Sequence, residues 1–433
     1  MDIENNETAS SVDDLPADEL HRKGFITNYP PSRYWKGTFQ SQAQANDRLN
    51  LYIHIPYCIQ RCSYCFFKIT ELSDSNPKEI DHYVDYLCRE IVMVSELYGW
   101  SKRPVDTLYF GGGTPSLLKA RHMDQILTAL HDHFNMALSE FVFEVEPITY
   151  SKSKSKELSQ FGITRLSFGI QSFHDDIVAK TGRKDTEKMN VAAIKRALDT
   201  GVILNIDLLS GLEGETEETW RYSVDRAVSL GVQSITVYKM ELYQNSKYYA
   251  DLRSDSIILP TDDQEMVFMN YAMEQLYANN YLNSTYFTFT KNGEYQHKHL
   301  HQRWLGEDTY GLGVSAFSSL EREYIQNTSN TDKYIEFIDK GELPVERGMR
   351  LSSMDLIARD IVLGMKTSSL DCRWIKAKHG VNLLSKNNNM LQKLIEHEFV
   401  VVLDKTIKMT RKGVFYGDFV GKSLSRYLLD SVE

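Results

Sequence analysis

Short apolar runs alternate with longer amphipathic runs from Leu51 onward. Six runs rich in β-branched and aromatic residues are predicted to be strands: Leu51–Ile55, Val105–Phe110, Phe141–Val145, Ile163–Phe168, Val202–Leu208 and Ser234–Tyr238. The amphipathic runs between them are predicted to be helices: Glu79–Leu97, Met123–Phe134, Lys154–Phe161, Glu187–Thr200 and Glu217–Leu230. Because strands that alternate with helices form parallel βαβ units, the pattern predicts an α/β fold with a partial, TIM-like (β/α)6 barrel.

The pattern changes after the sixth strand. Thr261–Asn279 is predicted to be a helix and Asn283–Thr290 a strand. From about Glu346 the pattern is helical, and Glu398–Met409 is predicted to be a β pair that turns at Asp404-Lys405. This order of elements predicts a small α+β module that resembles a winged helix.

Five segments are predicted from these changes. They are a disordered leader over 1–20, an N-terminal extension over 21–49, the barrel over 50–290, a Gly/His-rich connecting segment that closes the site over 291–345, and the C-terminal module over 346–433.

Composition narrows the class of protein. The 433 residues are 42% hydrophobic and 25% charged, which is typical of a globular protein. The chain has no apolar run long enough for a membrane span, and its polar, acidic N-terminus is unlike a signal peptide. The net charge of -10 disfavours a general nucleic-acid binder. An odd number of cysteines, five, disfavours a disulfide framework, so we expect a reduced, cytoplasmic location.

Three of the cysteines follow the first strand as C-x3-C-x2-C: Cys58, Cys62 and Cys65. A [4Fe–4S] cube takes four ligands, so three thiolates leave one iron open to a small molecule. A zinc site is an alternative, but zinc requires a fourth ligand, and His54 lies inside the strand. Three core thiols are a further alternative. Cys88 and Cys372 are interpreted as core thiols.

At these residues the chain resembles the radical S-adenosylmethionine (SAM) enzymes. More narrowly, from about Tyr34 to the end, it resembles the branch of the oxygen-independent coproporphyrinogen III dehydrogenases, the heme chaperones and related radical SAM methyltransferases. The resemblance implies a [4Fe–4S] cluster held by Cys58, Cys62 and Cys65. It also implies that SAM binds the open iron and is cleaved by one electron to methionine and a 5′-deoxyadenosyl radical. An electron donor such as flavodoxin or ferredoxin and a small-molecule substrate are the implied partners.

Further motifs lie near the carboxyl ends of successive predicted strands, where a barrel of this kind builds its site. Glycines permit close backbone approach to a ligand, and the alternation of a strand places Glu144 and Glu146 on one face. The resemblance implies these SAM contacts: Gly111, Gly112, Gly113 and Thr114 at the amino group, Glu144 with Glu146 behind it, Gln171 and Asp207 at the ribose, Arg183 at the carboxylate, and Tyr57 and Tyr238 near the nucleoside.

Two later motifs are less specific. The Gly-rich Tyr310–Phe317 lies near the site and the substrate in the family. If Gln296–His301 were a strand, its histidines would share one face, either as ligands or as a partly exposed polar face. The heme chaperones have His-Asn-x-x-Tyr-Trp here; His299 and Trp304 match it, whereas Leu300 and Arg303 replace Asn and Tyr.

Two substitutions are used to predict which reaction of this branch the chain carries out. Phe67 stands where the coproporphyrinogen dehydrogenases have an additional Cys, and Glu213 replaces a usual Pro. An intact SAM site with a changed substrate side favours C-methylation or cyclopropanation of a specialised substrate by a second SAM. The alternatives are a tetrapyrrole enzyme (coproporphyrinogen-oxidising or heme-degrading), a heme-binding chaperone and an inactive scaffold.

Overall fold

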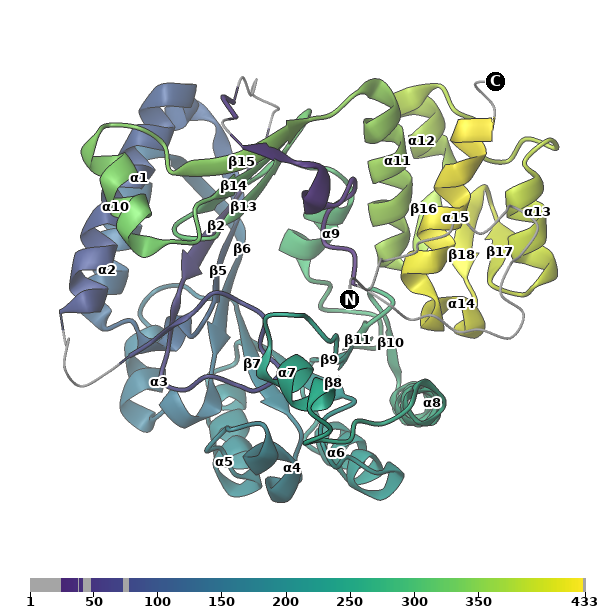
Figure 1. The fold of residues 1–433 in the computed structure, drawn as a ribbon, viewed down its shortest axis with the longest axis horizontal. Coiled ribbons are helices and arrows are strands. Elements are labelled where there is room, and N and C mark those ends of the chain that lie inside the picture. The colour runs from purple at the N-terminus through teal and green to yellow at the C-terminus, as the bar shows by residue number, and fades with distance from the viewer. Residues whose placement is uncertain (1–24, 38, 42–47, 73–77, 431–433) are drawn as a thin grey trace.

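A computed structural model describes residues 25–430 except 38, 42–47 and 73–77, so the predicted leader over 1–20 lies outside the described residues. The centre of the described part is one curved sheet of 13 strands (Figure 1). Its strand order is β1-β15-β14-β13-β12-β2-β5-β6-β7-β8-β9-β11-β10. The sheet does not close on itself, because its first and last strands, β1 (Lys36–Gly37) and β10 (Tyr281–Asn283), are edges.

Six consecutive parallel strands confirm the predicted βα repeat: β2 (Leu49–Ile55), β5 (Pro104–Gly112), β6 (Asn135–Val145), β7 (Arg165–Gln171), β8 (Ile203–Ser210) and β9 (Ser234–Lys239). The predicted helices are α1 (Glu79–Tyr98), α2 (Ala120–His133), α3 (Lys152–Leu158), α5 (Glu187–Leu198) and α6 (Glu217–Ser229). Within this repeat, the short helix α4 (Asp175–Lys180) was not predicted.

The two faces of these strands differ sharply. Leu51, Ile53 and Ile55 of β2 are fully buried in the main hydrophobic core, whereas Tyr52 and His54 point to the opposite, inner face. The same alternation runs through the neighbouring strands, with inner-face residues Thr107, Tyr109, Glu140, Glu144, Arg165, Ser167, Asn205, Asp207, Thr236 and Tyr238. The helices thus cover an apolar outer face, and the inner face is lined with polar groups.

The remaining strands extend the sheet on both sides. β12 (Thr309–Leu312) pairs in parallel with β2, and β13 (Phe317–Leu320), β14 (Glu323–Asn327) and β15 (Val345–Arg350) follow as antiparallel strands. On the other side, β11 (Thr288–Lys291) pairs antiparallel with β9 and β10. A short two-stranded sheet joins β3 (Tyr57–Cys58) to β4 (Thr70–Glu71).

Two sequence-based predictions are corrected here. The predicted strand Asn283–Thr290 is a hairpin, because Ser284 and Thr285 donate backbone hydrogen bonds to the Thr288 carbonyl and turn the chain between β10 and β11. The segment Gln296–His301 is not a strand: it enters helix α9 (Lys298–Trp304), which His297 caps by accepting a hydrogen bond from the Leu300 amide. The histidines therefore point in different directions.

The remaining helices are α7 (Lys247–Arg253), α8 (Asp262–Ala278) and α10 (Thr331–Asp339), with 3-10 turns at Ser32–Tyr34, Trp100–Lys102, Pro115–Leu117, Pro147–Thr149 and Met365–Thr367. The C-terminal part has its own hydrophobic cluster. It consists of α11 (Ser353–Gly364), β16 (Ser369–Asp371), α12 (Cys372–His379), α13 (Asn389–Glu396), β17 (Val400–Leu403), β18 (Thr406–Met409), α14 (Arg411–Phe415) and α15 (Gly417–Asp430). The predicted β pair is β17 and β18.

Helix α9 lies between the inner face of the sheet and the C-terminal part (Figure 1). The N-terminal residues Phe25 and Ile26 pack in the same region, in a cluster with Phe287, Trp304 and Val362. No helix in the described ranges has the length and apolar character needed to cross a membrane.

Candidate active site at the carboxyl ends of the strands

The three motif cysteines lie on a loop that begins directly after β2. Cys58 belongs to β3, and the Cys65 amide donates a hydrogen bond of 3.0 Å to the Cys62 carbonyl. The loop between them is held from outside, because the Ser63 amide donates to the Thr181 carbonyl and the Ser63 carbonyl accepts from the Tyr248 amide, both at 2.9 Å. All three thiols are partly exposed at the end of the barrel where the carboxyl ends of the strands meet.

The environment of these thiols suits a cluster. Burial is the main cause that raises the pKa of Cys58 to about 12 and that of Cys65 to about 11, and the charges of Glu146, Cys65 and Cys62 contribute to the rise at Cys58. Three neighbouring thiolates therefore require positive charge from a metal centre. The described residues hold no group of three or more side chains arranged for a single metal ion. A cube binds each thiolate on a different iron, so its ligands need not converge on one point.

The glycine loop after β5 passes very close to the cysteine loop. The Gly113 amide donates 2.8 Å to the Ile55 carbonyl, and the Thr114 amide donates 2.7 Å to the Tyr57 carbonyl. A Cβ atom at Gly113 would lie 2.6 Å from the Tyr57 carbonyl and 3.0 Å from the Cys58 Sγ. The Thr114 hydroxyl donates to the Cys58 Sγ at 3.4 Å. Glycine is thus required here by the approach of the two loops.

Two buried carboxyl groups, those of Glu144 and Asp207, lie on the inner face below this loop. Glu144 accepts hydrogen bonds from the Tyr109 hydroxyl at 2.6 Å and the Gly112 amide at 3.0 Å. Asp207 accepts hydrogen bonds from the side-chain amide of Asn205 at 2.8 Å and from the Ser167 hydroxyl at 3.3 Å. Burial, with a smaller contribution from the charge of Asp207, raises the pKa of Glu144 to about 7. Burial also raises the pKa of Asp207, to about 6.

Tyr238, near the end of β9, lies close to the carboxyl groups of Asp207 and Glu144. Burial raises the pKa of its phenol, and the charges of Asp207 and Glu144 raise it further. Its ring stacks on Phe287, with ring centroids 5.3 Å apart. The structure therefore brings Glu144, Asp207 and Tyr238 together, as the sequence predicts. These hydroxyl, amide and carboxyl groups have the hydrogen-bonding chemistry that a ribose and a charged amine require.

Arg183 joins the cysteine loop to the strand ends. Its guanidinium pairs with Asp185 at 2.7 Å and with Glu146 at 3.5 Å, and it donates 2.9 Å to the Gly169 carbonyl. It also lies 4.0 Å from the Cys62 Sγ. Glu146 accepts hydrogen bonds from Gln60 at 2.8 Å and from Thr114 at 3.3 Å. Glu146 thus lies beside the cysteine and glycine loops, one residue after the end of β6.

Gln171 and Tyr57 complete the predicted set. Gln171 ends β7 with a φ of 68°, and its side-chain amide lies 2.9 Å from the place of a Cβ on Gly169. Tyr57 packs edge-to-face on Tyr83 of α1, with ring centroids 5.5 Å apart, and its hydroxyl donates 3.4 Å to the Glu79 carbonyl. The Tyr57 ring therefore contacts α1 rather than the carboxyl groups.

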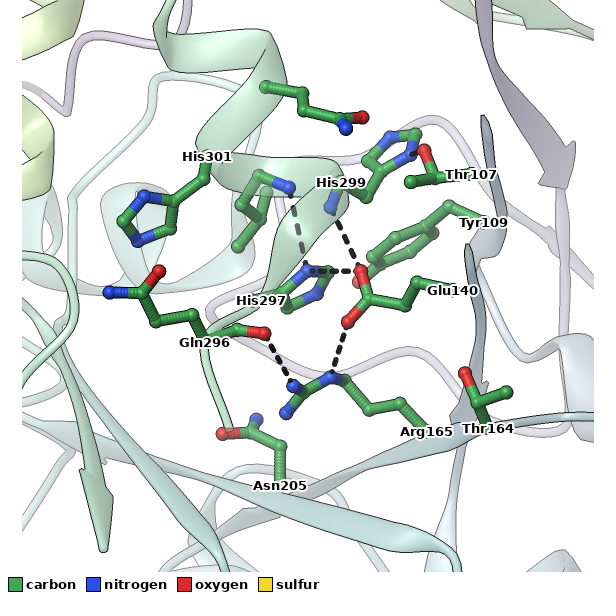
Figure 2. A network of polar contacts seen from close by, with 12 residues as sticks. Thr107, Tyr109, Glu140, Thr164, Arg165, Asn205, Gln296, His297, His299 and His301 are labelled. Carbon is green, nitrogen blue, oxygen red and sulfur yellow. Dashed lines mark hydrogen bonds and ion pairs between the residues drawn. The ribbon is translucent and has the colours of Figure 1, made fainter. Parts of the chain in front are cut away.

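A second polar network occupies the inner face at the amino-terminal half of the strands (Figure 2). Glu140 of β6 pairs with Arg165 of β7 at 2.9 Å and with His297 Nδ1 at 3.2 Å, and it accepts from the His299 amide at 2.9 Å. The His299 ring is hydrogen-bonded to the Thr107 hydroxyl at 2.7 Å.

His297 and His299 are buried, at 6% and 3% exposure, so the expected partly exposed face is wrong for both. Burial lowers the pKa of both rings, that of His299 to about 3. Glu140, Arg165 and Thr107 were missed by sequence reasoning. For Thr107 and Arg165 the signal was a polar residue inside a predicted strand, whereas Glu140 directly precedes the predicted strand Phe141–Val145.

The chain is similar in sequence and in fold to known proteins. Residues 52–227 match the family described as the Radical SAM superfamily. The heme chaperone HemW of Bacillus subtilis is 27% identical over 373 residues, which cover 85% of this chain and 97% of that protein. An oxygen-independent coproporphyrinogen III oxidase of Salmonella typhimurium is 26% identical over 411 residues, covering 89% of each chain.

A solved structure gives the same fold. The coproporphyrinogen III oxidase HemN of Escherichia coli, described as a radical SAM enzyme, superposes with a TM-score of 0.80 at 24% identity, covering 93% of this chain and 97% of that one. The chain thus carries a radical SAM domain over residues 52–227 and, over most of its length, is similar to a heme chaperone and to oxygen-independent coproporphyrinogen III oxidases.

Proposed function

We propose that this radical SAM enzyme holds a [4Fe–4S] cluster on Cys58, Cys62 and Cys65 and cleaves SAM reductively beside the inner-face carboxyl groups. When bound, the cluster would supply the electron that splits SAM into methionine and a 5′-deoxyadenosyl radical. The observation that carries the proposal is the joint placement of three neighbouring thiols and the Glu144 and Asp207 carboxyls at one end of the sheet. A donor such as flavodoxin or ferredoxin would supply the electron.

The chain's own residues bind, orient and shield the reactants. Glu144 and the backbone of Gly111, Gly112 and Gly113 would accept from and surround the SAM amino group. Arg183 would pair with the carboxylate of SAM, and Gln171 and Asp207 would bind the ribose hydroxyls of SAM. Tyr238 and the aromatic groups packed on it exclude water from the inner face. These contacts and the five segment limits predicted from the sequence remain predictions.

The cluster assignment is tested by removing one thiol. In anaerobically reconstituted protein treated with dithionite and SAM, we expect Cys62→Ala to lose the cluster signal in electron paramagnetic resonance and to form no 5′-deoxyadenosine. Cys88→Ala is the matched control, because Cys88 lies in α1 and packs against the hydrophobic core. Formation of 5′-deoxyadenosine by Cys62→Ala at the wild-type rate would overturn the assignment.

The relatives favour the oxidation of a tetrapyrrole as the reaction of this enzyme. Heme chaperones and coproporphyrinogen III oxidases match this chain over most of its length. The second polar network, with the buried rings of His297 and His299, offers imidazole groups on the same inner face. We expect carbon dioxide release from coproporphyrinogen III, or an open-chain product from heme. A heme absorbance band that persists through gel filtration without turnover would instead favour the chaperone.

C-methylation or cyclopropanation, expected from the sequence, is not supported by the relatives. It is retained as a second candidate because of Phe67, which takes the place of a cysteine and stacks on Phe66 at 4.3 Å. Phe66 stacks in turn on Tyr243 at 3.9 Å, so an aromatic stack stands beside the cysteine loop. Formation of S-adenosylhomocysteine together with 5′-deoxyadenosine would support alkylation, and 5′-deoxyadenosine alone would exclude it.

A further inference from the structure

The chain that follows the third cysteine is held to the rest of the protein near a single residue. On the amino side, the Cys65 amide bonds within the cysteine loop. Among the described residues, the next amide that donates to the backbone of another segment is that of Thr70, at 2.7 Å to the Pro56 carbonyl. Between these two amides, the hydrogen bond that ties the described chain to another element is accepted by the Phe66 carbonyl. The position of Cys65 therefore depends on how Phe66 is held.

Phe66 is held at both its ring and its carbonyl by the connection between β9 and α7. The Tyr243 ring stacks on the Phe66 ring, with ring centroids 3.9 Å apart. The Asn245 side-chain amide donates a hydrogen bond of 2.7 Å to the Phe66 carbonyl. Phe67 also stacks on Phe66, but it is itself 46% exposed and brings no support from another element. Two side chains distant in sequence thus fix the residue after Cys65.

These two side chains project from a turn with a buried base. The Ser246 amide donates 2.9 Å to the Tyr243 carbonyl and closes the turn, and the Ser246 hydroxyl caps α7 by accepting from the Tyr249 amide at 3.3 Å. Tyr248, in the first turn of α7, is fully buried in a hydrophobic cluster that includes residues of β8. Its amide donates 2.9 Å to the Ser63 carbonyl in the middle of the cysteine loop. The turn is therefore attached to that loop at a second, buried point and forms a rigid support.

The support extends to the sulfur of Cys65 through one peptide group. The Phe66 carbonyl and the Phe67 amide belong to the same planar unit, so the bond from Asn245 also sets the direction of the Phe67 N–H. Burial raises the pKa of Cys65 to about 11, and a hydrogen bond from the Phe67 amide opposes part of that rise. Hydrogen bonds to the ligand sulfurs are among the factors that set the reduction potential of an iron–sulfur cluster.

We propose that Tyr243 and Asn245 are positioning residues for the third cluster ligand: by holding Phe66 they fix the backbone of Cys65 and direct the Phe67 amide toward its sulfur. This inference rests on the proposed function, because it takes Cys65 as a ligand of the iron–sulfur cluster. The hydrogen bond from Asn245 is exposed to solvent, so it contributes little to global stability. Its removal should therefore change the cysteine loop and leave the thermal unfolding midpoint unchanged.

The test compares Asn245→Ala and Tyr243→Ala with Gln244→Ala, which changes the exposed residue between them in the same turn. In metal-free protein, we expect amide exchange in peptides that cover residues 62–69 to be about threefold to tenfold faster in the first two variants and unchanged in Gln244→Ala. In reconstituted protein, the midpoint potential of the iron–sulfur cluster is measured by titration followed by electron paramagnetic resonance. It should fall in the first two variants by up to about 59 mV, a tenfold change in the one-electron reduction constant, because a lost N–H bond destabilises the more negative, reduced form.

Two results would overturn the inference. One is exchange and potential in Asn245→Ala that match those of Gln244→Ala. The other is a lowered thermal unfolding midpoint in Asn245→Ala, because the residue would then support the fold rather than the ligand. The inference fails alone if these results come from wild-type protein that does bind a cluster and form 5′-deoxyadenosine. If the wild type binds no cluster, the proposed function fails and the inference falls with it.

Discussion

Gly112 shows how little space separates the carboxyl ends of β2 and β5. Its φ of 111° is rarely accessible to other residues, and a Cβ atom there would lie 2.6 Å from the His54 ring. Gly112→Ala should therefore lower the free energy of unfolding by about 3 kcal/mol or more, from backbone strain together with overpacking. Denaturant unfolding measures this change. At Gly162, with a φ of 71° and no atom near its Cβ position, alanine should cost only about 1 kcal/mol; equal costs at both positions would contradict the steric explanation.

Glu144 and Asp207 give the ligand-free protein a pH dependence whose sign follows from burial. Burial raises the pKa of Glu144 to about 7 and of Asp207 to about 6, so the folded protein holds more protons than the unfolded chain between about pH 4 and pH 7. Their contribution to stability is greatest at low pH and is lost as pH rises through that range.

The pH prediction is tested with Glu144→Gln, which fixes this side chain in the neutral form. Between pH 5 and pH 8 the wild type should lose about 1–3 kcal/mol of unfolding free energy through Glu144, and the variant should lack that loss. The exposed Glu218→Gln is the control and should keep the wild-type slope. A Glu144→Gln curve parallel to the wild-type curve would contradict the assignment of this proton to Glu144.

Among the elements, α1 holds the Gly-rich loop after β12 through one buried carboxyl. Glu90 accepts hydrogen bonds of 2.7 Å from the Gly313 amide, the Asn327 side chain and the Tyr334 hydroxyl. Tyr83, about two turns earlier, donates to the His54 carbonyl and accepts from the Val314 amide. Helix α1 thus fixes the loop beside the strand that leads to the cysteines.

Removing this carboxyl should loosen the loop measurably. Glu90→Ala leaves three buried donors without an acceptor, so we expect a loss of about 3 kcal/mol or more in unfolding free energy and faster amide exchange at residues 313–315. Glu96→Ala, at an exposed position of the same helix, should stay within about 0.5 kcal/mol of wild type. Unchanged exchange in the loop of Glu90→Ala would show that other contacts hold it.

The elements were predicted unevenly, for physical reasons. The βα repeat was predictable because β2 and its neighbours bury one apolar face under each helix. Helix α9 was not, because its histidines are fixed by distant partners, Glu140 and Thr107, that no local pattern reveals. In the site, Glu144, Asp207 and Tyr238 could be predicted from strand ends.

At the scale of the whole molecule, the N-terminal residues tie the barrel to the C-terminal part. Lys366, 1% exposed, pairs with Asp418 at 2.8 Å and lies 4.0 Å from the Phe25 ring centroid. The second oxygen of Asp418 accepts from the Ile26 amide at 2.8 Å. One carboxylate thus joins the 25–26 segment, the turn after α11 and the start of α15.

Loss of that carboxylate should weaken the connection. Asp418→Asn leaves the Lys366 ammonium buried without its counter-charge, so we expect about 3 kcal/mol of destabilisation and faster proteolysis near residue 26. Limited proteolysis with mass mapping and thermal unfolding measure the two effects. Asp404→Asn, at a carboxylate that is 89% exposed, is the control and should change neither; equal behaviour of the two variants would contradict a joining role for Asp418.

The polar inner face of the sheet bears on how this protein can change over time. Folding depends chiefly on the outer face, where Leu51, Ile53, Ile55 and their counterparts are sealed under the helices. Side chains on the inner face contribute less to that burial, so paired polar groups there, such as Glu140 and Arg165, can be replaced together without opening the apolar core. New chemistry can therefore be selected at every second residue of the same strands while the scaffold stays intact.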